Sequence, residues 1–306
     1  HNKLLKPIPC VQISHVTKRF GEDLVLKEVN LDLNYGQVYG IVGNNGSGKT
    51  VLMKCICGFL PATTGTIHVS GKQIGKDTDF PESLGVIIET PGFLTQYTGM
   101  KNLEILANMR RLISKADIRL ILRKVGLDPD MKKPVGKYSL GMRQRLGIAI
   151  ALLGNPEFLV LDEPVNGLDP AGMKEVRDLI LKLNHEKNIT ILISSHLLDE
   201  LSKIVTRYGI INDGMLIEEV TAAELNERCQ HKLVFTVDDV QKAAAIFTET
   251  IPAEQIRIAG NQVILSSHLE EAAELNKRLV QQNVAVNGFW VHAEGLEQYF
   301  MKRIGG

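Results

Sequence analysis

Three apolar runs stand out in the first two hundred residues, and each ends next to polar or charged residues. Residues 37–42 lead into a glycine-rich segment, residues 158–162 end in an acid, and residues 189–195 are followed by His196. Continuous apolar runs of this length predict buried strands of a parallel sheet. Because ligands bind at the carboxyl ends of such strands, the residues after these runs are the first candidates for a site.

Two other kinds of pattern flank these runs. Alternation of apolar and polar residues predicts strands near residues 11 and 29, and residues 93–153 have a mainly helical pattern. Within that stretch, Ser114 and Asp117 form a capping-box pattern before a helix at 118–125, which Gly126 would end. The α/β pattern resumes at residue 157 and ends near residue 219.

Beyond residue 221, the pattern predicts a second, small domain. Strands are expected at 233–237, 255–258, 262–265 and 284–291, with helices at 240–248, 269–281 and 296–303. The order β-α-β-β-α-β is typical of a ferredoxin-like fold. This part of the sequence shows no nucleophile, metal cluster or glycine-rich anion loop.

The glycine-rich segment after the first apolar run predicts a phosphate site. Its residues are Gly43, Asn44, Asn45, Gly46, Ser47, Gly48, Lys49 and Thr50, and a segment with helical character follows. Glycines allow successive backbone N–H groups to converge on an anion, and the start of a helix adds a favourable dipole end. Lys49 would reach the β- and γ-phosphates and Thr50 would ligate Mg²⁺. The chain is therefore predicted to bind a nucleoside triphosphate.

The prediction is completed by three residues at the ends of the other two apolar runs. Asp162 is placed to hold Mg²⁺, and Glu163 would orient or deprotonate the attacking water. His196 follows the third run and would sense the γ-phosphate. Each residue alone is typical of an ordinary strand end, and only their common register with residues 43–50 indicates catalysis.

At this point the chain resembles the ATPase subunit of an ABC transporter. The family signature stands here as Tyr138-Ser139-Leu140-Gly141-Met142, and the D-loop matches residues 166–169, ending in Asp169. The resemblance covers about residues 10–228. It implies that Ser139 and Gly141 contact the γ-phosphate of ATP bound to a second ATPase subunit, either an identical chain or a paralogue, and that Asp169 also belongs to the nucleotide site.

The resemblance also implies the architecture. We expect an α/β P-loop ATPase domain over residues 10–228, with a RecA-like core and a helical subdomain at about 93–153. Residues 229–306 would form the ferredoxin-like α+β domain, and by analogy this accessory domain serves dimerisation or regulation.

An adenine platform follows from spacing within the family. Members place an aromatic residue about thirty positions before the Walker lysine, and Phe20 stands 29 positions before Lys49. A ring at this point could stack on a purine. The alternative is that Phe20 is simply a partly buried aromatic at a strand end.

The position of the family's Q-loop glutamine, 40 residues after Lys49, holds Glu89. A carboxylate can ligate Mg²⁺ but cannot donate a hydrogen bond, so Glu89 is a candidate for both the metal site and catalysis. The surrounding segment resembles the E-loop of ATPases in lantibiotic-immunity and bacitracin-resistance exporters. Met142 also departs from the family pattern, and its side chain cannot make the polar contact to nucleotide that the resemblance implies at that position.

Composition narrows the possible partners. The 35 Lys and Arg residues balance 35 Asp and Glu residues, so no net charge favours nucleic acid. No apolar run approaches the roughly 18 residues of a membrane span, so an exporter would need a separate permease subunit. Four cysteines without a regular framework are expected to be reduced. These points favour a peripheral protein at the cytoplasmic face of the membrane.

We therefore predict an ATP hydrolase that uses ATP and Mg²⁺ to power an ABC exporter for lantibiotic or other peptide antibiotics. One alternative is the ATPase of another ABC-2 exporter, for a drug, polysaccharide or lipid. A soluble ABC ATPase acting on ribosomes or DNA is a second. A P-loop kinase or GTPase is a third, against which the signature and His196 argue.

Overall fold

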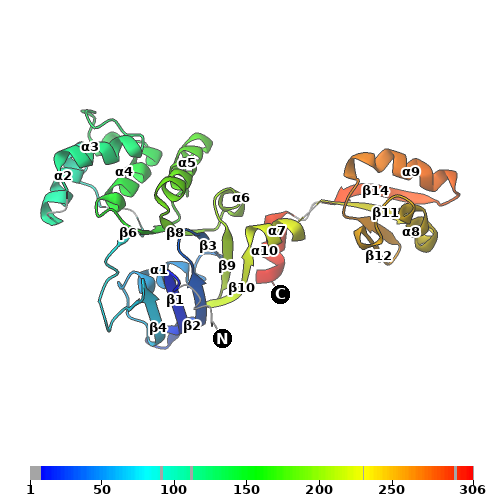
Figure 1. The fold of residues 1–306 in the computed structure, drawn as a ribbon, viewed down its shortest axis with the longest axis horizontal. Coiled ribbons are helices and arrows are strands. Elements are labelled where there is room, and N and C mark those ends of the chain that lie inside the picture. Colours follow the sequence, from blue (N-terminus) through cyan, green and yellow to red (C-terminus); the bar gives the residue numbers. More distant parts are fainter. Residues whose placement is uncertain (1–7, 90–91, 111–112, 230, 293–294, 306) are drawn as a thin grey trace, which may run out of the picture. The chain divides into compact units, whose positions relative to one another are not determined.

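The structure, a computed structural model, describes residues 8–89, 92–110, 113–229, 231–292 and 295–305. The chain divides into two compact units, the first ending at Ala222 and the second beginning at Ala223 (Figure 1). Thr90 and Pro91, which belong to the predicted E-loop, lie outside the described residues.

The central sheet of the first unit has six strands in the order β10-β9-β3-β8-β7-β6. They are β3 (Val38–Val42), β6 (Leu84–Ile87), β7 (Phe158–Asp162), β8 (Thr190–Ser195), β9 (Arg207–Asn212) and β10 (Met215–Thr221). All pairs are parallel except that of β9 with β10. The three buried strands predicted from apolar runs are confirmed. Because β8 lies between β3 and β7 and all three strands are parallel, the three candidate segments lie together at the carboxyl ends of these strands.

A second, four-stranded sheet lies at the amino-terminal end of the chain and has the order β2-β1-β4-β5. Its strands are β1 (Val11–Phe20), β2 (Asp23–Leu33), β4 (Thr64–Val69) and β5 (Lys72–Gln73). One core cluster joins Leu31 of β2, Ile41 of β3 and Leu52 of helix α1 (Lys49–Ile56). Packing between both sheets and α1 therefore fixes the glycine-rich segment between β3 and α1.

The other helices of the first unit come from the middle of the chain. They are α2 (Gly99–Arg110), α3 (Lys115–Lys124), α4 (Leu140–Leu152), α5 (Pro170–Lys187) and α6 (Leu198–Leu201), with a 3-10 turn at Val135–Lys137. The predicted capping box is confirmed, since the Ser114 side chain accepts from the Asp117 N–H and the Asp117 carboxylate accepts from the Ser114 N–H. Gly126 follows α3 with φ +73°, which a residue with a side chain adopts only with strain.

The second unit contains a four-stranded antiparallel sheet in the order β12-β13-β11-β14. Its elements are β11 (Lys232–Val237), α8 (Val240–Thr248), β12 (Ile256–Ala259), β13 (Gln262–Leu265), α9 (Ala272–Gln281), β14 (Val286–His292) and α10 (Leu296–Ile304), after α7 (Ala222–Arg228). Side chains of β11, β13, α8 and α9 share one core cluster. The predicted β-α-β-β-α-β order is confirmed.

Two predicted boundaries in this unit were wrong by two or more residues. The helix expected from residue 269 begins at Ala272, because Leu269–Glu271 form a 3-10 turn after His268, whose φ is +59°. The strand expected from residue 284 begins at Val286. Val284 instead packs into the core of the unit. Among the described residues, no helix has the length and apolarity that crossing a membrane requires.

Candidate nucleotide site

The glycine-rich segment forms a tight loop between β3 and α1. Gly46 has φ +81° and Gly48, which precedes the helix, has φ +106°, so both positions favour glycine. A Cβ on Gly43 would lie 2.5 Å from the carbonyl oxygen of Ile211. Gly43 therefore has room for the backbone alone, while Gly46 and Gly48 are favoured by their positive φ, and together they allow the loop to turn its backbone toward an anion.

The side chain of Lys49 folds back over this loop. Its Nζ donates to the carbonyl oxygens of Gly43 at 2.6 Å and Asn44 at 3.1 Å, and it lies 3.8 Å from Glu163 Oε1. Burial lowers the pKa of the Lys49 ammonium, while the negative charges of Glu163 and Asp162 oppose that shift. The Lys49 ammonium is thus already surrounded by oxygen atoms, and the oxygens of a phosphate bound to the loop would be further acceptors for it.

A chain of hydrogen bonds connects this loop with the two acids at the end of β7. Thr50 Oγ1 donates to Asp162 Oδ2 at 2.9 Å, and Ser194 Oγ donates to Asp162 Oδ1. Ser194 Oγ also accepts from the Glu163 N–H at 2.9 Å, and the Glu163 carboxylate lies 2.9 Å from His196 Nδ1. The predicted residues Thr50, Asp162, Glu163 and His196 therefore form one connected group with Lys49 (through Glu163).

The donor set at this edge fits a triphosphate with Mg²⁺. Ser47 Oγ is buried and has no hydrogen-bond partner among the described residues, which leaves it available to a ligand oxygen. Thr50 Oγ1 and Asp162 supply hard oxygen donors. Within the described part of the chain, no three His, Cys, Asp or Glu residues cluster in a geometry that could hold a metal. The Thr50 hydroxyl and the Asp162 carboxylate suit Mg²⁺, which is usually bound through one or two carboxylates, waters and phosphate oxygens.

Phe20 lies at the end of β1 and is 45% exposed. Lys18 Nζ stands 4.9 Å from the centre of its ring and donates to the carbonyl oxygen of Pro61. The exposed ring is open to stacking. Its assignment to adenine stays a prediction.

The signature residues lie in a different part of the same unit. Ser139 caps α4 by accepting from the Met142 N–H at 3.2 Å, and Asp169 caps α5 by accepting from the Gly172 N–H at 3.0 Å. Gly141 is packed near Gly172 and Leu168. α4 lies with α2 and α3, apart from α1 (Figure 1). Across the described residues, no hydrogen bond or ion pair connects Ser139 or Gly141 with residues 43–50, and their contact with the ATP of a second chain stays a prediction.

Glu89 lies two residues after β6, whose carboxyl end is on the same side of the sheet as Asp162 and Glu163 at the end of β7. Its φ is +64°. Its Oε1 lies 2.6 Å from Lys54 Nζ, and its side chain is 67% exposed. Lys54 comes one helical turn after Thr50 on α1, so the pair lies near the predicted metal ligands. In this structure the carboxylate pairs with an amine, and its roles in metal binding and catalysis stay predictions.

Sequence reasoning missed three residues that position this site. Ser194 contacts both acids, Lys54 holds Glu89, and Gln144 of α4 donates to the carbonyl oxygen of Pro164 at 2.9 Å. Ser194 could have been found, because it is a polar residue in a fully buried strand, two positions before His196. The partners of Lys54 and Gln144 have no local signal in the sequence.

Comparison with known proteins agrees with this geometry. The sequence matches the ABC transporter family profile over residues 26–166. It is 38% identical to the bacitracin transport ATP-binding protein BcrA of Enterococcus faecalis over 97% of this chain and 96% of that protein. The chain belongs to the family of ABC transporter ATP-binding proteins. As a member it is an ABC-type ATPase that binds ATP.

Other relatives and solved structures extend the comparison. BcrA of Bacillus licheniformis is 39% identical over 97% of both chains, and the lantibiotic transport ATP-binding protein SrtF of Streptococcus pyogenes is 38% identical over 68% of this chain and 90% of its own length. The ATP-binding cassette MJ1267, solved in its ADP conformation, superposes with a TM-score of 0.64, 27% identity, and coverage of 71% of this chain and 92% of that one. The predicted P-loop ATPase fold is confirmed.

Proposed function

We propose that this chain is the ATP-hydrolysing subunit of an ABC exporter that removes peptide antibiotics of the bacitracin type. The observation that carries the proposal is the extent of the similarity to the two bacitracin transport proteins, which covers 97% of this chain and so includes the second unit. The similarity to the lantibiotic transport protein SrtF covers only 68% of the chain. Bacitracin is therefore the first antibiotic to test, and lantibiotics come second.

We infer that one face of the catalytic site is built by this chain alone. Residues 43–50 would bind the phosphates of ATP, and Thr50 and Asp162 would hold Mg²⁺, which neutralises charge on the phosphates when it is bound. Glu163 would polarise the attacking water. His196, held 2.9 Å from the Glu163 carboxylate, would steady both that group and the γ-phosphate. Phe20 would support the adenine.

A second ATPase subunit would supply the opposite face. Ser139 and Gly141 of that subunit would contact the γ-phosphate, and Asp169 would approach the site from the loop before α5. Ser139 already lies at a helix start, where backbone N–H groups favour an anion. Closure of the dimer on ATP and its release after hydrolysis would drive a membrane permease bound at the cytoplasmic face.

Glu89 is the residue through which this exporter group would differ from other ABC ATPases. If the ion pair with Lys54 opened, the Glu89 carboxylate would be free to approach the metal. A neutral glutamine at this position would form no ion pair with Lys54. The ion pair between Glu89 and Lys54 supports this role, since Lys54 stands one helical turn after Thr50 on α1.

The test is a purification of tagged Glu163→Gln protein from detergent-solubilised membranes of the native host with ATP and Mg²⁺, followed by mass spectrometry. Lys49→Ala, which should not hold ATP, is the matched control. Recovery of a polytopic membrane protein with Glu163→Gln alone supports the exporter. Deletion of that protein should then increase sensitivity to bacitracin.

Other outcomes separate the alternatives. A membrane partner whose deletion leaves bacitracin and lantibiotic sensitivity unchanged would indicate an exporter for another substrate. Recovery of ribosomal or DNA-bound proteins with no membrane partner would contradict the exporter altogether.

A further inference from the structure

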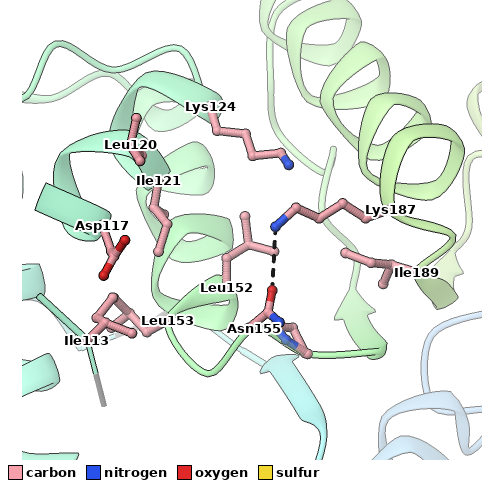
Figure 2. A pocket seen from close by; sticks show the side chains of 11 residues that line it. Ile113, Asp117, Leu120, Ile121, Lys124, Leu152, Leu153, Asn155, Lys187 and Ile189 are labelled. Atoms are coloured by element: carbon pink, nitrogen blue, oxygen red, sulfur yellow. Dashed lines mark hydrogen bonds between the residues drawn. The ribbon is translucent and has the colours of Figure 1, made fainter. Parts of the chain in front are cut away.

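A cavity of about 350 Å³ lies in the first unit between the helical subdomain and the core. It is lined by residues 113, 117, 120, 121 and 124 in and before α3, residues 152, 153, 155 and 156 at and after the end of α4, and residues 187 and 189 at and after the end of α5 (Figure 2). Its volume is within the usual range of small-molecule sites, about 300–1,000 Å³. Nothing in the proposed mechanism uses this cavity.

The cavity is remote from the nucleotide site. Lys187 is the last residue of α5, whereas Asp169 of the D-loop caps the first turn of that helix. At 1.5 Å per residue, a helix of 18 residues separates the two ends by about 27 Å. Ile189 likewise precedes β8, while His196 follows it. A ligand in the cavity would therefore not compete with ATP for space.

The walls of the cavity are largely apolar. Leu152, Leu153 and Ile189 are each less than 10% exposed, and Figure 2 shows Ile121 beside them. Asp117 lies on the side away from the lysines, and its carboxylate is already bound to the hydroxyl and N–H of Ser114. Such walls suit a hydrocarbon body.

Two lysines define the other side of the cavity. Lys124 ends α3 and Lys187 ends α5, and their ammonium groups point toward one another in Figure 2. Lys187 Nζ is 3.5 Å from Asn155 Oδ1, and no ion pair among the described residues involves either lysine. Burial lowers the pKa of the Lys124 ammonium, Lys187 and Lys182 lower it further, and Glu186 partly opposes the shift.

Each lysine alone has an ordinary explanation, because cations at helix carboxyl ends are favoured by the helix dipole. That explanation does not account for two ammonium groups directed at one point above an apolar cavity. Like charges placed this closely repel, and an anion between them would turn the repulsion into two charge-assisted hydrogen bonds.

We propose that this cavity binds a small organic anion with an apolar body, with its carboxylate between Lys124 and Lys187 and its hydrocarbon part against Ile121, Leu152 and Ile189. A medium-chain monocarboxylate has this chemistry. The inference does not depend on the exported substrate.

The test measures binding of octanoate to the full-length chain by isothermal titration calorimetry, with octanol and inorganic phosphate as comparison ligands. Octanol keeps the apolar body without the charge, and phosphate keeps the charge without the body. We expect octanoate to bind at least tenfold more tightly than either. We also expect Lys124→Gln/Lys187→Gln to weaken octanoate at least tenfold.

The matched control is Arg123→Gln/Lys174→Gln, which removes one cation from each of the same two helices at exposed positions. This control should bind octanoate as the unchanged chain does.

Three results would overturn the proposal. Equal binding of octanol and octanoate would indicate an apolar cavity without charge recognition, and equal binding of phosphate would indicate a simple surface anion site. Unchanged octanoate affinity in Lys124→Gln/Lys187→Gln would show that the lysines do not hold the anion.

Discussion

Removal of the Ser194 hydroxyl should slow ATP hydrolysis without emptying the nucleotide site. Ser194 is fully buried, donates to Asp162 and accepts from the Glu163 N–H at 2.9 Å. In Ser194→Ala, Asp162 loses a donor and the Glu163 N–H keeps only the carbonyl oxygen of Ser194, at 3.2 Å. Both acids then lose part of what orients them.

The size of the effect follows from this geometry. A hydrogen bond to a charged group contributes about 1.5–3 kcal/mol. If that contribution is realised in the transition state, kcat falls by about tenfold to a hundredfold, since about 1.4 kcal/mol corresponds to a factor of ten. ATP affinity should change much less, because Lys49 and the loop at residues 43–50 keep their contacts.

The assay is steady-state ATP hydrolysis with Mg²⁺, together with ATP binding measured by calorimetry. Ser195→Ala is the matched control, because the Ser195 hydroxyl is also buried but, within the described residues, accepts from the Leu197 N–H and contacts neither acid. Ser194→Thr keeps the hydroxyl and should recover part of the rate. A kcat in Ser194→Ala equal to that of the unchanged chain would refute the positioning role.

Three further results are expected. Glu89→Gln and Lys54→Gln should change the hydrolysis rate non-additively in a double-mutant cycle, because both act through the Glu89 carboxylate. Their effect on the free energy of unfolding should be small, since an exposed ion pair contributes only about 0.2–1 kcal/mol. Additive rate changes would contradict this coupling. Burial raises the pKa of the Cys10 and Cys55 thiols to about 11, so at pH 8 iodoacetamide should modify the less buried Cys229 first, as peptide mass spectrometry can show. By the same shifts, the free energy of unfolding should decrease as the pH rises from about 8.5, where unfolded thiols ionise, toward 11; equal labelling of the three cysteines, or stability constant over that range, would contradict the burial argument.

Local patterns were sufficient for the parts of the site that lie within one element. Residues 43–50 join a buried strand to a helix, and both the turn chemistry and the neighbouring strand are visible in the sequence. The same holds for the capping box at Ser114, where the two partners are three residues apart.

Contacts between distant elements could not be predicted in the same way. Thr50 and Asp162 are 112 positions apart in the sequence. They come within hydrogen-bond distance because β3 and β7 lie on either side of the single strand β8 in the sheet, and a single sequence does not reveal this strand order. Lys54 and Glu89 are both ordinary surface residue types, so their pairing had no signal. The meeting of Lys124 and Lys187 depends in the same way on how the ends of α3 and α5 pack.

The most direct measurement of the central claim is ATP turnover and oligomeric state in purified Glu163→Gln protein beside the unchanged chain. The unchanged chain should hydrolyse ATP with Mg²⁺. Glu163→Gln should bind ATP, turn it over at least a hundredfold more slowly, and accumulate as a dimer in light scattering, because the charge that polarises water is lost while the contacts that hold ATP remain. Turnover in Glu163→Gln at the rate of the unchanged chain would contradict the account.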